Sequence, residues 1–197
     1  MALGTLNVVA NLLLVVVGIY LAADPGLYFR GTLRLLPRAI RPRASAALSS
    51  AAATLRKWLG GQLMAMLLVG VLTFIGLALL DIPLALSLAT IAGLLEFVPF
   101  LGPIIAAIPA VLIAFTHEPA TGLYVAVLYF GIQQLEGYVL MPLVQRWAVA
   151  LPPALGALSV VVFAVIFGLP GALFAVPLAI VVMVLVDELY VEHDLLG

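Results

Sequence analysis

The chain has 197 residues, of which 66% are hydrophobic and only 9% are charged, and its mean hydropathy is +1.33. A soluble domain is excluded, because water-soluble proteins need roughly a quarter of charged residues to cover their surface. The 8 basic and 9 acidic residues leave no basic excess of the kind that nucleic-acid binding requires. With no cysteine and two histidines, the sequence predicts no metal site and no cofactor. We expect an all-α, polytopic integral membrane protein whose surroundings are the lipid bilayer.

The first apolar run, residues 6–23, is predicted to be a retained transmembrane helix. A secretory signal peptide would begin with basic residues, but no Lys or Arg precedes Arg30. Seven of the eight basic residues then fall between residues 30 and 57. By the positive-inside rule, residues 26–58 are cytoplasmic, so we expect the N-terminus to lie outside the cell.

Residues 26–58 are expected to lie along the membrane surface as interfacial helices. Arginines recur there at helical spacing beside apolar residues, which is typical of an amphipathic helix. Pro37 and Pro42 interrupt helix continuity, so two short pieces are favoured over one rod. The basic side chains either bind anionic lipid or only hold this segment at the cytoplasmic surface. They are those of Arg30, Arg34, Arg38 and Arg41.

Residues 59–80 form the next predicted span, which is long enough to cross about 30 Å of hydrocarbon. The apolar stretch that follows, residues 84–116, is interrupted by Pro99, Gly102 and Pro103. Each of its two arms is shorter than the hydrocarbon is thick. The arms therefore either cross a thinned bilayer with little tilt or form a re-entrant hairpin.

A similar pattern returns near the end of the chain. Residues 123–141 are a predicted span, and residues 154–186 are a second broken hairpin whose interruption contains Gly168, Pro170 and Gly171. Residues 187–197 are the expected cytoplasmic tail. Counting the spans gives the two hairpins opposite orientations. The prediction is a single membrane domain over residues 1–197, with five to seven membrane segments.

Two interrupted segments of opposite orientation indicate a transporter binding site. A helix that ends inside the membrane leaves backbone groups unpaired, and only protein or a water-filled cavity can satisfy them. Those groups can hold a solute or an ion, which favours a membrane transporter of a small solute. The alternative is that Pro and Gly merely kink ordinary spans.

Two carboxylates, Glu96 and Glu136, fall inside predicted membrane segments. Ionisable groups at that depth are costly and usually face a partner or an aqueous path. Glu136 is the stronger candidate, because Gln133 lies one helical turn before it and Gln134 adds a second amide. We expect Glu136 to couple transport to protons or cations. The alternative is a neutral, hydrogen-bonded glutamate that only holds helices together.

Six short motifs occur in order along the chain, and together they resemble the autoinducer-2 exporter family of permeases in its proteobacterial branch. The resemblance runs from about the first helix to the C-terminus. Family members are usually longer and have further membrane helices before this point, so the chain resembles their C-terminal part only. The motifs are LEFVPFLGP (95–103), QLEGY (134–138), LPP (151–153), FGLPG (167–171), AVPL (175–178) and LYVE (189–192).

The resemblance implies a multi-pass transporter, or permease, in the bacterial inner membrane that assembles as a homo-oligomer. Members are linked to export of a quorum-sensing signal, and others act as cation/proton antiporters. The resemblance therefore does not identify the solute of this chain. A truncated, non-transporting scaffold or regulatory fragment is the alternative. An enzyme is not expected, because the sequence places no nucleophile beside a base within a span.

Overall fold

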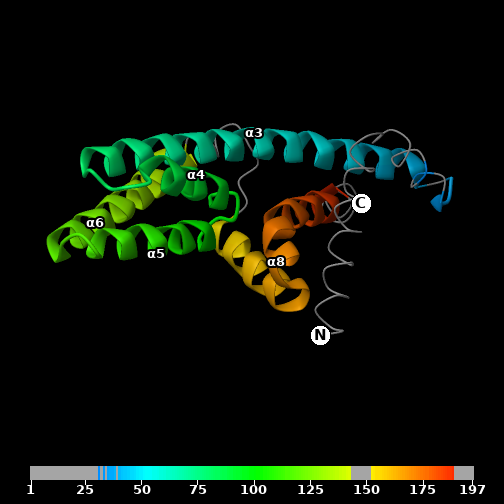
Figure 1. The fold of residues 1–197 in the computed structure, drawn as a ribbon. Helices are drawn as coiled ribbons and strands as arrows, with labels where there is room; N and C mark the ends of the chain where they lie inside the picture. Colours follow the sequence, from blue (N-terminus) through cyan, green and yellow to red (C-terminus); the bar gives the residue numbers. More distant parts are fainter. Residues whose placement is uncertain (1–30, 32, 34, 39, 143–151, 189–197) are drawn as a thin grey trace. The chain divides into compact units, whose positions relative to one another are not determined.

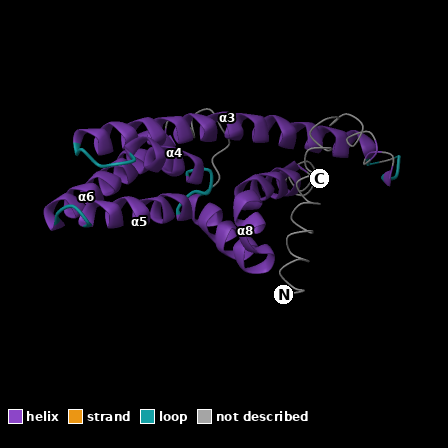
Figure 2. Ribbon diagram, in the orientation of Figure 1, coloured by secondary structure: helices purple, strands orange, loops and turns teal. Residues whose placement is uncertain are grey.

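A computed structural model describes residues 31, 33, 35–38, 40–142 and 152–188. All regular structure in these residues is helical (Figure 2). The predicted first span, Arg30, Arg34 and the tail beyond residue 188 lie outside the described residues. The chain divides into two units, of which the larger comprises residues 53–180.

The first long element is α3, a single helix over Arg41–Leu79 (Figure 1). The boundary that the sequence predicts between an interfacial segment and a span, at residues 58 and 59, falls inside this helix. It is continuous because Pro42 occupies its first turn, where proline is tolerated, and residues 44–53 are rich in alanine. With 39 residues, α3 is about 58 Å long, roughly twice the hydrocarbon thickness. The bilayer therefore accommodates only part of it, and the charge-free C-terminal half fits.

Two shorter helices, α4 (Ala85–Leu95) and α5 (Leu101–Phe115), follow and pack against each other. The chain between them contains Pro99 and reaches Phe100, whose φ of 70° turns the backbone before α5 begins. Pro103 lies in the first turn of α5, where its missing N–H is not needed. The break occurs where Pro and Gly predict it; its depth in the membrane stays a prediction.

Helix α6 (Pro119–Leu135) packs against α5 and begins with a proline at its first position. It continues without interruption into a five-residue π-helix, η1 (Glu136–Leu140). The widened turn is closed by the backbone N–H of Met141, which donates to the carbonyl of Glu136.

The last described element, α8 (Pro153–Val186), is a hairpin of two helical arms (Figure 1). The direction changes at Gly168, which has φ 67° and ψ −147°, a conformation that side-chain-bearing residues rarely adopt. Pro170 lies just after the bend, in the first turn of the second arm. A Cβ on Gly171 would collide with the carbonyl of Phe163, so the arms meet there at backbone contact.

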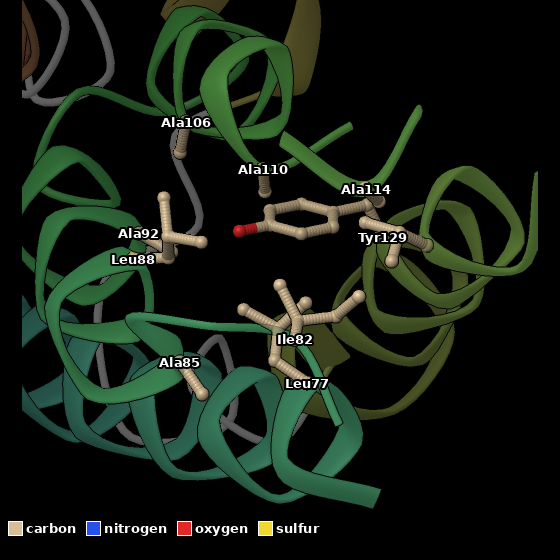
Figure 3. Close-up of a cluster of buried hydrophobic side chains, with 10 residues drawn as sticks. Leu77, Ile82, Ala85, Leu88, Ala92, Ala106, Ala110, Ala114 and Tyr129 are labelled. Atoms are coloured by element: carbon tan, nitrogen blue, oxygen red, sulfur yellow. The ribbon is translucent and has the colours of Figure 1, made fainter. Parts of the chain in front are cut away.

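Small residues bring α3, α4, α5 and α6 close together. Gly70 and Gly93 face each other where α3 crosses α4, and a Cβ on Gly93 would lie 2.8 Å from the carbonyl oxygen of Met66. Figure 3 shows the resulting cluster of alanines around one aromatic ring. Close approach through small residues is the usual packing mode of membrane helices. The cluster contains Leu77, Ile82, Ala85, Leu88, Ala92, Ala106, Ala110, Ala114, Val125 and Tyr129.

Three of the described helical stretches have the length and apolar composition needed to cross a bilayer, namely α3, Pro119–Leu140 and Ala154–Val186. Helices α4 and α5 are apolar but shorter. Large apolar side chains are exposed along all these elements, including Ile104, Phe130 and Val165. Apolar side chains on this scale are stable outside a protein core only against lipid or another protein. The structure is thus that of an all-helical membrane protein; its span count stays a prediction.

Candidate functional site

The two intramembrane carboxylates predicted from the sequence come together in the structure. Glu96 caps the C-terminal end of α4 and is 1% exposed, and Glu136 begins η1 and is 7% exposed. Their carboxyl groups are close enough to interact electrostatically. Neither carboxyl oxygen of Glu96 accepts a hydrogen bond from a donor among the described residues, and the side chain that it meets is the Glu136 carboxyl group. We call Glu96 and Glu136 the carboxyl pair.

The amide of Gln133 supports one member of the carboxyl pair. Its Nε2 donates to Oε2 of Glu136 over 2.8 Å, the interaction expected for residues three apart on a helix. Gln134, the other predicted amide, is exposed. Each residue turns the helix by about 100°, so Gln134 lies on a different face from Gln133. The structure brings Gln133 to the pair and leaves Gln134 away from it.

A π-helix begins at Glu136. A π-turn accommodates one extra residue, and single π-turns inside α-helices occur frequently at functional sites. Here the wide turn starts at Glu136 itself, whose carbonyl accepts the bond from Met141. The sequence pattern around residue 136 did not predict this change of helix type.

A third helix contributes Gln62, which the sequence reasoning missed. Its Nε2 donates to the backbone carbonyl of Glu96 over 2.6 Å, and the bond is buried. The last carbonyls of a helix lack N–H partners, so a side-chain amide satisfies one of them here. The available signal was that Gln62 is the one amide in the apolar run of residues 59–80.

An aromatic contact lies beside this bond. The rings of Trp58 and Phe97 meet edge to face, with centroids 6.0 Å apart and an interplanar angle of 71°. Trp58 is one helical turn before Gln62, and Arg56 and Lys57 just before it are exposed. Tryptophan beside basic residues is typical of a membrane–water interface. Along α3, Gln62 lies one helical turn beyond Trp58, and its bond to the Glu96 carbonyl places the α4 end of the carboxyl pair beside that turn.

The break between α4 and α5 requires Gly102. A Cβ at this position would overlap the carbonyl of Leu95, because the first turn of α5 rests directly on the last turn of α4. The backbone N–H of Gly102 also donates to the carbonyl of Val98 over 2.9 Å. Close contact at the break fixes the backbone that carries Glu96.

The remaining predicted residues lie apart from the pair. Arg38 is exposed and Arg41 is half-buried, with its Nε donating to the carbonyl of Leu36 over 2.9 Å. Gly168, Pro170 and the rest of the α8 bend form their own element. Within the part of the chain that the structure describes, no three His, Asp or Glu residues gather as metal ligands.

The site can be compared with known proteins through the motifs that carry it. A family model described as AI-2E family transporter matches residues 2–191, which include every residue of the site. The chain belongs to the AI-2E transporter family. This confirms the resemblance seen in the ordered motifs. It also makes a membrane permease the function class of its family, which consists of transport proteins rather than enzymes.

Individual relatives are bacterial, and about three in ten residues of the matched stretches are identical to this chain. The "Putative transport protein YrrI" of Bacillus subtilis (strain 168) is 31% identical over 166 residues, 84% of this chain and 47% of the relative. YueF of the same organism, with the same description, is 29% identical over 181 residues, 89% of this chain and 49% of the relative. A transport protein so described from Thermotoga maritima is 30% identical over 125 residues, 63% of this chain and 39% of the relative. The chain thus spans about half the length of the curated relatives it matches.

Proposed function

We propose that this chain is the ion-coupling part of a small-solute permease, in which the carboxyl pair binds and releases a proton or a monovalent cation. The observation that carries the proposal is the approach of Glu96 and Glu136 in a buried site where no donor of the described residues is bonded to the Glu96 carboxyl group. Two carboxylates so placed repel each other and are both desolvated. A bound proton or cation removes that cost, and its release restores it.

The neighbouring residues support an exchange site rather than structural glue. A glutamate that only joins helices would have its oxygens bonded to another helix, as polar groups in membranes usually are. Here the amide bonded to Glu136 comes from its own helix, the bond from α3 goes to the backbone of Glu96, and across the helices the two carboxyl groups meet each other. Two carboxyl groups can hydrogen-bond to each other only while one of them carries a proton, so this contact itself depends on a bound proton.

Glu136→Gln is the decisive variant. Gln keeps the size and hydrogen-bonding capacity of a protonated Glu but cannot release a proton. In proteoliposomes that contain a pH-sensitive dye, we expect an imposed Na⁺ gradient to drive proton movement in the wild type. The variant should lose at least about tenfold of that rate at equal incorporation, as is usual when an essential acid–base group is removed.

Glu118→Gln is the matched control, because Glu118 precedes α6 and is exposed. It should retain the wild-type rate. If Glu136→Gln and Glu96→Gln both retain driven proton movement, the carboxyl pair has no part in coupling and the proposal is wrong. No proton movement by the wild-type chain would favour the second candidate, a non-transporting scaffold. The observation in favour of the scaffold is that the chain spans about half the length of its relatives.

We further propose that the protein resides in the bacterial inner membrane as a homo-oligomer. The exposed apolar side chains of α5 and α6 would contact lipid or a second copy. Cross-linking in intact membranes tests the assembly, because a monomer gives no linked species.

A further inference from the structure

Four buried side-chain polar atoms of the described residues lack a hydrogen-bond partner, and all of them belong to the unit of residues 53–180. They are the hydroxyl of Thr73, the hydroxyl of Tyr129 and both carboxyl oxygens of Glu96. A buried polar group without a partner is costly and usually indicates a water, an ion or a functional role. Tyr129 stands out because it is also the aromatic residue at the centre of the alanine cluster.

Tyr129 lies on the same helix face as Gln133 and Glu136. It precedes Gln133 by four residues and Glu136 by seven, so all three lie along one side of α6 and η1. The side chain is 9% exposed. In Figure 3 its ring lies beside Ala110, and its hydroxyl oxygen points away from Ala114 toward the side where Leu88 and Ala92 of α4 are labelled.

The hydroxyl therefore ends beside the same face of α4 that carries Glu96. Leu88, Ala92 and Glu96 follow one another at four-residue spacing, and the first two belong to the cluster that holds Tyr129. Ala92 and Glu96 are separated by about 6 Å along the helix, at 1.5 Å per residue. A link between the Tyr129 hydroxyl and Glu96 across one helical turn would be a water-mediated one. Tyr129 is also on the side of Glu96 away from Trp58, since α4 runs toward Phe97 and the Trp58 ring.

We propose that the Tyr129 hydroxyl is the proton-transfer group on the far side of the carboxyl pair, opposite the side on which Trp58 lies. The inference rests on the proposed function, because it assigns the route by which that site is loaded. The members of the cluster that α4 and α5 contribute include the small residues Ala92, Ala106 and Ala110 as well as Leu88. A buried hydroxyl is the simplest group that both accepts and donates a proton there.

The transfer leaves Tyr129 unchanged. A proton arriving from the far side binds the phenol oxygen while the hydroxyl's own proton passes through one bridging water to a carboxylate oxygen of Glu96. The phenol is neutral before and after, the water is regenerated, and Glu96 gains the proton that arrived. Release toward the far side is the reverse sequence.

Tyr129→Phe tests the assignment, because it removes one oxygen atom that has no partner in the fold. We expect Na⁺-gradient-driven proton movement in dye-loaded proteoliposomes to fall at least about tenfold, as is usual when a group that transfers a proton is removed. The ratio of the rate in H₂O to the rate in D₂O should also be larger for the variant than for the wild type, because proton transfer becomes the slow step. Tyr138→Phe is the matched control, since Tyr138 is 77% exposed.

Two further readouts separate this proposal from a structural role and from the proposed function. The melting temperature of Tyr129→Phe should equal or exceed that of the wild type, because removing an unpaired buried hydroxyl is neutral or stabilising. The infrared band of the protonated carboxyl pair, identified by its loss in a Glu96→Gln, Glu136→Gln double variant, should persist. If Tyr129→Phe moves protons at the wild-type rate while Glu136→Gln does not, the coupling site stands and Tyr129 is not its link. If the wild type moves no protons, both proposals are overturned.

Discussion

A single side-chain amide secures the end of α4. Gln62 donates to the backbone carbonyl of Glu96, and no helical N–H is positioned to replace it. We expect Gln62→Leu to lower the free energy of unfolding by about 1–3 kcal/mol, because the carbonyl is left buried and unpaired. Thermal unfolding in detergent measures the effect. Gln134→Leu, at an exposed amide, should change stability little; equal effects of the two variants would mean that the bond to Glu96 contributes nothing.

For single residues, the sequence predicted contacts within one helix but not contacts between helices. The contact between Gln133 and Glu136 depends only on helix geometry, so their three-residue spacing predicted it. The approach of Glu96 to Glu136 and the bond from Gln62 depend on how α3, α4 and α6 pack. No spacing rule reaches across 34 residues, the separation between Gln62 and Glu96.

The α4–α5 hairpin depends on backbone contact at its break. A Cβ at Gly102 has no room, because the carbonyl of Leu95 occupies its position. Gly102→Ala should therefore destabilise the protein by about 1–3 kcal/mol through overpacking, which differential scanning fluorimetry measures. Gly131→Ala is the control, since nothing lies within 4 Å of a Cβ there and alanine favours helix. A hairpin that tolerates alanine at Gly102 as well as at Gly131 would refute this account of the break.

Both breaks were predicted from Pro and Gly, because these residues act on the backbone without help from distant contacts. The continuity of α3 was not predicted. Pro37 and Pro42 suggested two interfacial pieces, but Pro42 falls in the first turn of the helix and the alanines after it extend the helix into the apolar run. The passage from membrane surface to bilayer interior that is expected at residue 58 does not interrupt the backbone hydrogen bonds of a helix. Composition alone therefore could not show whether a helix ends there.

For the whole molecule, the basic residues predict a topology that labelling can test. Cysteine substitutions are informative because the native chain contains none. Ser49 in α3 and Glu118 before α6 are both exposed. On intact cells we expect a membrane-impermeant thiol reagent to label Glu118→Cys but not Ser49→Cys, and permeabilised cells to show both. Labelling of Ser49→Cys from outside would show that the predicted orientation is wrong and that residue 49 lies outside the cell.

The single turn between Trp58 and Gln62 has an electrical consequence. With the membrane surface at the exposed basic residues beside Trp58, four residues of α3 place the carboxyl pair about 6 Å below that surface, about one fifth of a 30 Å hydrocarbon core. About four fifths of the membrane voltage then falls between the pair and the opposite surface, the part that Tyr129 would serve. At 2.3 kcal/mol per charge per 100 mV, a proton reaching the pair from that side gains or loses about 1.8 kcal/mol, roughly a twentyfold change in occupancy. The occupancy of the site would thus follow voltage even where the pH is equal on both sides.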